Sequence, residues 1–233
     1  MFQNILPIIR SILQLFEKFL LLFKVVLIRA TPYLNRKRKL DMSYRAWDFN
    51  RYSSLELCAY EINDKNIQGS VAELGVFQGD FAAKINELFP NRKLYLFDTF
   101  EGFEIKDIKI DSEKGHRTQG HNVDFSKTSE EAVLKKMLFV KNCEIRKGYF
   151  PDTVNGLEDT FAFVSIDADL YKPIYEGLCY FYPRLSVGGY IFVHDYNNLL
   201  FTGAKDAVRQ FSIEKGVNYF PLSDDGGTAI FAR

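Results

Sequence analysis

The stretch VAELGVFQGDF, Val71 to Phe81, decides the fold. An apolar run ends there in a turn that holds two glycines, Gly75 and Gly79. A helical pattern follows over residues 82–89, and a second apolar run ends at Asp98. A strand, a glycine turn, a helix and a strand in this order indicate a parallel sheet, whose ligands bind beyond the carboxyl ends of the strands. The turn therefore predicts the class of fold and the place of a site.

The alternation of strands and helices continues to the C-terminus. Three further β-like runs are Cys143–Gly148, Ala162–Asp167 and Gly189–Asp195, with helical patterns between them. The last two runs, Asn218–Leu222 and Thr228–Ala232, flank an Asp-Gly turn of the kind that joins a hairpin. We therefore predict an α/β domain over residues 41–233, with a mostly parallel sheet, helices on both faces and an antiparallel last strand.

One segment does not follow this pattern. Residues 100–122 are long, polar and punctuated by glycine. Loops of this length in compact domains are usually lids or disordered segments. Because the segment follows the second strand, we predict a lid over the site. It carries His116 and His121, and either could serve as a catalytic base, although a histidine in a polar loop is more often only solvated.

Charge and cysteine content limit the functions of the chain. The chain of 233 residues has no net charge, but residues 1–45 carry nine basic and two acidic side chains, a net charge of +7, which leaves −7 on the remainder. A neutral to acidic body argues against nucleic-acid binding, which needs a basic face. Three widely spaced cysteines predict neither a disulfide framework nor a zinc site, and a cytoplasmic location is the simplest inference.

Residues 1–40 differ from the rest of the chain. Charges interrupt the apolar pattern of residues 1–28, so no stretch reaches the ~20 residues of a spanning helix. A basic cluster, Arg36 to Lys39, follows. Two readings stay open: an amphipathic helix that makes peripheral contact with the inner face of the membrane through residues 1–39, or a helix that packs on the domain or on a second subunit of a homo-oligomer.

The spacing of the turn favours a nucleoside ligand without a pyrophosphate. The pattern is E-x-G-x-x-x-G, with Glu73 inside the strand, and not the G-x-G-x-x-G that places several backbone N–H groups on a pyrophosphate. Asp98 ends the next strand, where a carboxylate can accept hydrogen bonds from both ribose hydroxyls. S-adenosylmethionine has a ribose, an adenine and a cationic amino-acid tail, and it suits this arrangement.

Acidic side chains and one imidazole follow the fourth and fifth strands. Asp167 and Asp169 follow one strand, and His194 and Asp195 follow the other. Because the carboxyl ends of parallel strands lie at one edge, these groups are expected to crowd together, and like charges need a cation or a proton. Oxygen-rich ligand sets suit Mg²⁺ or Mn²⁺. The alternative is that these residues cap helices and bond locally.

At these residues the chain resembles the macrocin O-methyltransferase family of S-adenosylmethionine-dependent enzymes. The similar stretches are VAELGVFQGDF, LYLFDTFEGF, KGYFPDTV, VSIDADLY, YPRLSVGGYIFVHDYNN, GAKDAVRQF and the terminal GGTAIFAR. They run in order from Val71 to the C-terminus. The resemblance implies a Rossmann-like, seven-stranded class I methyltransferase domain that methylates sugar hydroxyls, often with Mg²⁺.

The resemblance also implies roles for particular residues. The metal ligands would be Asp167, His194 and Asp195, and the candidate catalytic residues are Asp167, His194 and His121. His194 stands where the family commonly has Asp, so it is either a ligand or a general base. The cofactor-binding residues would be Glu73, Gly75, Phe77, Gly79, Asp98, Ser126, Gly148, Tyr149 and Phe150.

The substrate and two competing functions stay open. A sugar hydroxyl of a surface glycan, a lipid-linked glycan or a glycosylated natural product is the expected acceptor, and a membrane-directed N-terminus favours a lipid-linked or surface glycan. One alternative is a nucleotide-sugar or NAD-linked oxidoreductase on a similar fold, which the glycine spacing disfavours. The other is a non-catalytic, membrane-associated scaffold, which the acidic cluster disfavours.

Overall fold

The computed structural model describes residues 16, 19, 20, 22, 48–118 and 124–233. The chain divides into two units, Met1–Ser43 and Tyr44–Arg233. Most of the first unit lies outside the described residues. The predicted amphipathic helix is therefore not described beyond four of its residues, and the predicted boundary at residue 40 is not described. Of the parts that are described, no helix is both long and apolar enough to cross a membrane.

A seven-stranded sheet forms the centre of the second unit, in the order β3-β2-β1-β4-β5-β7-β6. Five adjacent strands pair in parallel, and β7 pairs antiparallel with both β5 and β6. The Rossmann-like sheet with an antiparallel last strand is therefore confirmed. The strands are β1 Ser70–Leu74, β2 Leu94–Asp98, β3 Cys143–Lys147, β4 Phe161–Ile166, β5 Leu185–Val193, β6 Phe220–Leu222 and β7 Thr228–Ala232.

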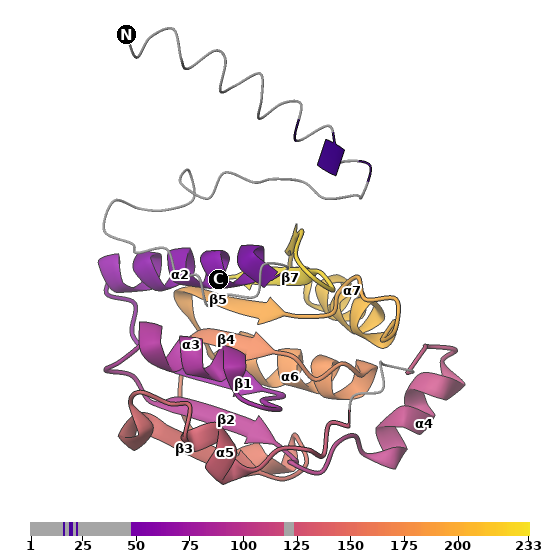
Figure 1. Cartoon of the computed structure of the whole chain (residues 1–233), viewed down its shortest axis with the longest axis horizontal. Coiled ribbons are helices and arrows are strands. Elements are labelled where there is room, and N and C mark those ends of the chain that lie inside the picture. The colour runs from indigo at the N-terminus through magenta and orange to yellow at the C-terminus, as the bar shows by residue number, and fades with distance from the viewer. Residues whose placement is uncertain (1–15, 17–18, 21, 23–47, 119–123) are drawn as a thin grey trace, which may run out of the picture. The chain divides into compact units, whose positions relative to one another are not determined.

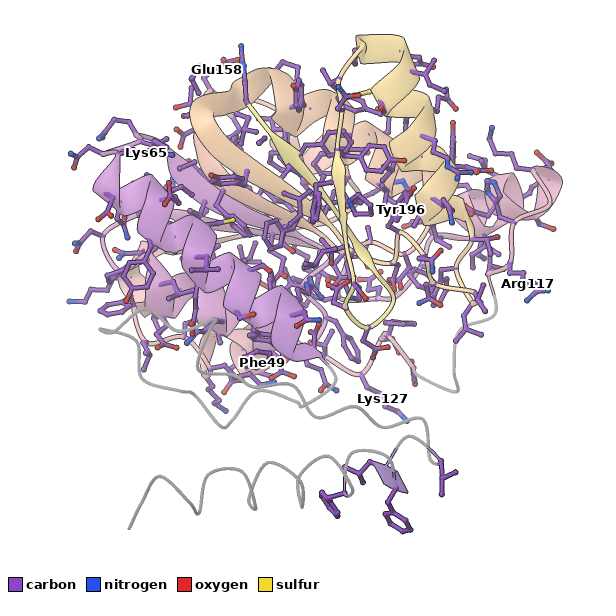
Figure 2. The ribbon with its side chains drawn as sticks, turned by 90° about the horizontal axis from the view of Figure 1, so that it is seen from above. Phe49, Lys65, Arg117, Lys127, Glu158 and Tyr196 are labelled. Atoms are coloured by element: carbon purple, nitrogen blue, oxygen red, sulfur yellow. The ribbon has the colours of Figure 1, made fainter. Side chains whose placement is uncertain are left out.

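Helices cover both faces of this sheet. The fully buried parallel strands read as near-continuous apolar runs because both of their faces meet helices. One face packs against α2, α3 and α5, and the other packs against α6 and α7. The bounds are α2 Phe49–Asp64, α3 Asp80–Leu88, α5 Glu130–Leu134, α6 Tyr171–Arg184 and α7 Gly203–Lys215. Figure 2 shows side chains filling the space between these layers, while Lys65, Lys127 and Glu158 project outward at the rim.

The segment predicted as a long loop contains a helix, so that part of the prediction was wrong. Helix α4 spans Ile105–Glu113, beyond the carboxyl ends of the strands, as Figure 1 shows. Its buried residues are Asp107 and Asp111 rather than apolar side chains, so the segment lacks the apolar periodicity that marks a helix. One of the helical patterns predicted between the strands, over residues 151–157, was also wrong, since only a short 3-10 turn, Asp152–Val154, forms there.

Candidate active site

The site begins where the order of the strands reverses, between β1 and β4. Gly75 follows β1 with a φ of 84°, and Asp167 follows β4. The Asp167 N–H donates to the Leu74 carbonyl at 2.8 Å. A Cβ on Gly75 would lie 2.1 Å from the Asp167 carbonyl oxygen, so only glycine fits this position. The glycine predicted from the sequence therefore brings two strand ends into direct backbone contact at the switch point.

Asp98 at the end of β2 holds the turn after β1. One carboxylate oxygen accepts the backbone N–H groups of Val76 at 2.7 Å and Phe77 at 2.8 Å. The other oxygen accepts the N–H of Phe100 at 2.7 Å. Such charge-assisted bonds are about twice as strong as neutral ones. Asp98 thus fixes the backbone beside the cavity, a role that the prediction of direct ribose binding did not include.

A cavity of about 540 Å³ opens at these strand ends. Seven of the predicted cofactor residues line it: Glu73, Gly75, Phe77, Asp98, Gly148, Tyr149 and Phe150. Two others are not part of its described lining. Gly79 caps the N-terminus of α3 and lies against Val133, whose Cγ1 would be 3.0 Å from an added Cβ. The Ser126 side chain is exposed and donates to Asp124.

Glu73 offers a buried acceptor to this cavity. The residue is 1% exposed, and its Oε2 has no hydrogen-bond partner among the described residues. Burial raises the pKa of Glu73 well above its usual value, and the nearby Arg51 only partly opposes this rise. A buried polar atom without a partner is costly unless a ligand satisfies it. The geometry therefore suits a ligand with an amino group near the end of β1.

The predicted acidic cluster does form, and it contains two cationic groups. Asp167 Oδ2 lies 3.0 Å from Nη2 of Arg51, and Asp167 Oδ1 lies 3.1 Å from Nδ1 of His194. The same Nδ1 lies 3.3 Å from Asp195 Oδ1. Arg51 also stacks on the ring of Phe81, with Cζ 3.9 Å from the ring centre. These contacts supply positive charge, which the sequence interpretation had left to either a cation or a proton.

These contacts shift the proton affinities of the cluster. Burial and Arg51 both lower the pKa of His194, but Asp167 and Asp195 outweigh them and hold it well above its usual value. Burial raises the pKa of Asp167, but His194 and Arg51 outweigh that effect and hold it well below the usual range. Burial and the neighbouring Asp195 carboxylate raise the pKa of Asp169. The cluster therefore favours an imidazolium among ionised carboxylates.

Backbone strain is concentrated at the same place. Phe77, Asp169 and Asp195 all line the cavity with a positive φ, of 47°, 59° and 59°. Side chains other than glycine rarely adopt this region, at a cost of order 1–3 kcal/mol each. Strain of this kind persists where the surrounding structure fixes the backbone, and it is typical of functional sites.

His194 also faces a second pair of carboxylates, which the sequence interpretation missed. Asp48 precedes α2, and Asp224 lies in the turn between β6 and β7. Ligand atoms of Asp48, His194 and Asp224 lie within 4.8 Å of one another. Burial raises the pKa of Asp48 to about 6. No sequence signal pointed to this pair, because each residue is far along the chain from the predicted cluster.

The residues at the strand ends fit one divalent cation. Ligand atoms of Asp167, His194 and Asp195 lie within 4.8 Å of one another, and an imidazole with two carboxylates is a donor set that Mn²⁺ or Mg²⁺ accepts. Arg51 contacts only Oδ2 of Asp167, whereas Oδ1 of Asp167 lies against Nδ1 of His194. Nδ1 of His194 is the atom that bridges the two carboxylates. To bind a metal through Nδ1, His194 would first have to release the proton from that atom.

Of the two histidines in the predicted lid, only His116 is among the residues that the structure describes. His116 lies outside the cavity lining, with Nδ1 3.1 Å from Asp111 and Nε2 3.0 Å from Asp206. These contacts link α4 to α7, so His116 has a structural role. His121 lies outside the described residues, so its catalytic role stays a prediction.

Two groups of lining residues were missed by the sequence interpretation. Arg51 lies on the buried face of α2 with Leu55, Ala59 and Ile62, and a lone cation at this spacing was an available signal. The second group is a wall of phenylalanines from separate loops, of which only Phe77 was predicted. We call it the phenylalanine wall, and its members are Phe77, Phe103, Phe125 and Phe201.

The strand order, the glycine turn and the cavity at the switch point are those of a Rossmann-like domain with a ligand site at the carboxyl ends of its strands. The family described as Macrocin-O-methyltransferase (TylF) matches residues 33–233. The chain belongs to this family.

Individual relatives agree with this assignment. Demethyldecarbamoylnovobiocin O-methyltransferase of Streptomyces niveus is 28% identical over 173 residues, which cover 69% of this chain and 64% of that protein, less than two thirds of its length. The 8-demethyl-8-(2,3-dimethoxy-alpha-L-rhamnosyl)-tetracenomycin-C 4'-O-methyltransferase of Streptomyces olivaceus is 25% identical over 216 residues, 88% of this chain and 80% of that protein. The solved structure of the O-methyltransferase NovP has a TM-score of 0.64 at 23% identity and 79% coverage of each chain, which shows the same fold.

Proposed function

We propose that this chain transfers the methyl group of S-adenosylmethionine to a hydroxyl group of a sugar in a surface glycan or a glycosylated natural product. The observation that carries this proposal is the shared cavity, which brings the cofactor turn after β1 and the carboxylates after β4 and β5 together. The name of the Streptomyces olivaceus relative describes methylation of a rhamnosyl group, which supports a sugar acceptor.

The cavity offers a place for each part of the cofactor. Glu73, with its unpartnered Oε2, would accept a hydrogen bond from the α-amino group. The turn fixed by Asp98 would meet the ribose, and Tyr149 and Phe150 after β3 would contact the adenine. This arrangement would leave the sulfonium methyl group facing the strand ends at Asp167 and Asp195. Holding donor and acceptor in line supplies much of the rate of such a transfer.

Charge at the strand ends would prepare the acceptor hydroxyl. A carboxylate of Asp167 or Asp195 can accept a hydrogen bond from the hydroxyl group and so orient it, while His194, as an imidazolium, orients both carboxylates through Nδ1. A neutral His194 could instead act as the general base for the acceptor hydroxyl, or bind a metal ion together with Asp167 and Asp195. Mg²⁺ or Mn²⁺ at these three residues would lower the pKa of a bound hydroxyl.

Location and assembly complete the proposal. We propose a cytoplasmic enzyme that contacts the inner face of the membrane through residues 1–39. The alternative is that this segment packs against a second subunit in a homo-oligomer. The basic charge of residues 1–45 supports attraction to anionic lipid.

Calorimetry with S-adenosylmethionine and NAD tests the cofactor directly. We expect the full chain to bind S-adenosylmethionine at one site per chain and to give no heat with NAD. Binding of NAD would favour the oxidoreductase alternative. Cofactor binding without turnover on any acceptor would favour the scaffold.

A further inference from the structure

Three buried polar atoms beside the cavity have no hydrogen-bond partner among the described residues. They are Oδ1 of Asp48, Nε2 of His194 and Oδ1 of Asp224. His194 lines the cavity, whereas Asp48 and Asp224 are not part of its described lining. A buried polar atom without a partner is costly, so three of them at one place indicate a ligand that all three share.

The three side chains are close enough to bind one ion. One ligand atom from each of Asp48, His194 and Asp224 lies within 4.8 Å of the other two, yet no hydrogen bond joins the three unpartnered atoms. Zn–N and Zn–O bonds of ~2.0–2.2 Å place two ligands of one ion at most ~4.4 Å apart. Small side-chain rotations reach that separation, and the space between the atoms is left for the ion.

The other ring nitrogen of His194 is already engaged. Nδ1 lies 3.1 Å from Asp167 Oδ1 and 3.3 Å from Asp195 Oδ1, and it must carry the proton because ionised carboxylates only accept. A histidine that donates Nδ1–H to a carboxylate keeps the Nε2 lone pair for a metal, and histidine ligands are usually held in this way. The ion would therefore replace a proton on Nε2 and leave Nδ1 unchanged.

The carboxylates come from segments that other contacts already bring together. Thr228 donates to Oδ2 of Asp224 at 2.6 Å, which orients that carboxylate and leaves Oδ1 available. Asn50, two residues after Asp48, donates from its side chain to the Ser223 carbonyl at 2.5 Å. The start of α2 and the turn between β6 and β7 therefore meet at this place, beside the end of β5.

The carboxylates around His194 outnumber the positive groups. They belong to Asp48, Asp167, Asp195 and Asp224. The positive groups are Arg51 and the His194 ring. Burial raises the pKa of Asp48 to about 6 and also raises the pKa of Asp224, and Arg51 and His194 only partly oppose the rise. A divalent ion would balance the two carboxylates in excess.

We infer that Asp48, Nε2 of His194 and Asp224 bind one divalent transition-metal ion. One imidazole and two carboxylates suit Zn²⁺ better than Mg²⁺, which prefers oxygen ligands alone. The bound ion joins the start of α2 and the β6–β7 turn to the end of β5. It also fixes the His194 ring, whose Nδ1–H orients the carboxylates of Asp167 and Asp195. The site does not depend on the methyl transfer proposed above.

Zinc titration of the full chain tests this site. The chain is freed of metal with a chelator, and binding of Zn²⁺ is followed by calorimetry near neutral pH. Since loss of a group that only hydrogen-bonds to a ligand costs ~10–100-fold in affinity, Asp48→Asn and Asp224→Asn should each cost at least ~100-fold. Asp225→Asn removes the same charge from the same turn and should change the affinity little. No binding at micromolar Zn²⁺, or binding that neither Asp48→Asn nor Asp224→Asn weakens, overturns the inference.

Asp195→Asn separates this group from the set formed by Asp167, His194 and Asp195. It removes only a hydrogen-bond partner of Nδ1, so it should weaken Zn²⁺ binding less than Asp224→Asn does. The reverse order would assign the ion to the strand ends and overturn the inference.

X-ray absorption identifies the ligands without any variant. The zinc edge of the loaded chain should show an imidazole among nitrogen and oxygen neighbours at ~2.0–2.2 Å, and no sulfur at ~2.3 Å. Sulfur neighbours would assign the ion to the free cysteines, Cys58, Cys143 and Cys179, and overturn the site. Because the ion binds the folded chain, saturating Zn²⁺ should raise the midpoint of thermal unfolding in wild type and much less in Asp224→Asn. Equal rises would contradict binding at this group.

Discussion

Replacing Arg51 with methionine should destabilise the domain by about 3–5 kcal/mol, because it leaves Asp167 without one of its two cationic partners. The Arg51 side chain is 5% exposed, and its Nη2 lies 3.0 Å from Asp167. Coulomb's law at that distance gives about 5.5 kcal/mol with an effective dielectric constant of about 20. Methionine avoids the cost of burying the guanidinium and keeps contact with Phe81, so the net loss is smaller than the Coulomb energy.

Denaturation with urea at pH 7 measures this loss, and two further variants serve as controls. Arg51→Lys keeps the charge but loses the planar contact with Phe81, so it should lose less stability than the methionine variant. Asp167→Asn should cost less in the Arg51→Met background than alone, with a coupling energy of about 2 kcal/mol. The pKa of Asp167 is depressed in the folded state, so the effect of Arg51 should be full above the unfolded pKa and should fade in acid. A loss below about 0.5 kcal/mol, typical of surface positions, would refute the reasoning.

Four further predictions follow from the site and the N-terminus. Asp98→Asn should weaken S-adenosylmethionine binding about tenfold in calorimetry, since an amide cannot accept all three backbone N–H groups; unchanged affinity would contradict the role of Asp98. The raised pKa of His194 means that its ion pairs stabilise the fold fully below 6.5 and are lost as pH rises through the folded value. The difference in free energy of unfolding between wild type and His194→Gln should therefore shrink in alkali. A difference that stays constant with pH would exclude a stabilising ion pair between His194 and the carboxylates of Asp167 and Asp195. Binding of Mg²⁺ or Mn²⁺, followed by calorimetry, should tighten with pH because His194 must release a proton; no binding at any pH, or binding unaffected by Asp195→Asn, would end the metal proposal. Deleting residues 1–39 should abolish sedimentation with anionic vesicles and keep cofactor binding, whereas loss of a subunit partner would show a packing role instead.

The sheet could be predicted from the sequence because its strands are buried on both faces. Such strands appear in the sequence as short apolar runs between turns. Gly75 marked a position where a backbone carbonyl leaves no room for a side chain. Helix α4 could not be predicted in this way. Its buried face carries Asp107 and Asp111, whose partners are Tyr149 and the N–H of Tyr171, and no apolar pattern records such contacts.

The part of the site that could be predicted consists of polar residues that directly follow a strand. Asp167, His194 and Asp195 come together as their positions indicated. The compensating charge of Arg51 was not predicted, because it comes from a helix that precedes the first strand. The contact between Asp98 and the backbone N–H groups of Val76 and Phe77 was missed for a related reason, since it depends on how two loops close on each other.

Methyl transfer from labelled S-adenosylmethionine to sugar acceptors tests the central claim most directly. The full chain is incubated with methyl-labelled cofactor and a panel of glycosides, with and without Mg²⁺, and the products are hydrolysed to single sugars. We predict label in an O-methyl ether of one sugar, together with one equivalent of S-adenosylhomocysteine. Label on nitrogen or carbon, or cofactor binding with no labelled sugar from any acceptor, would contradict it.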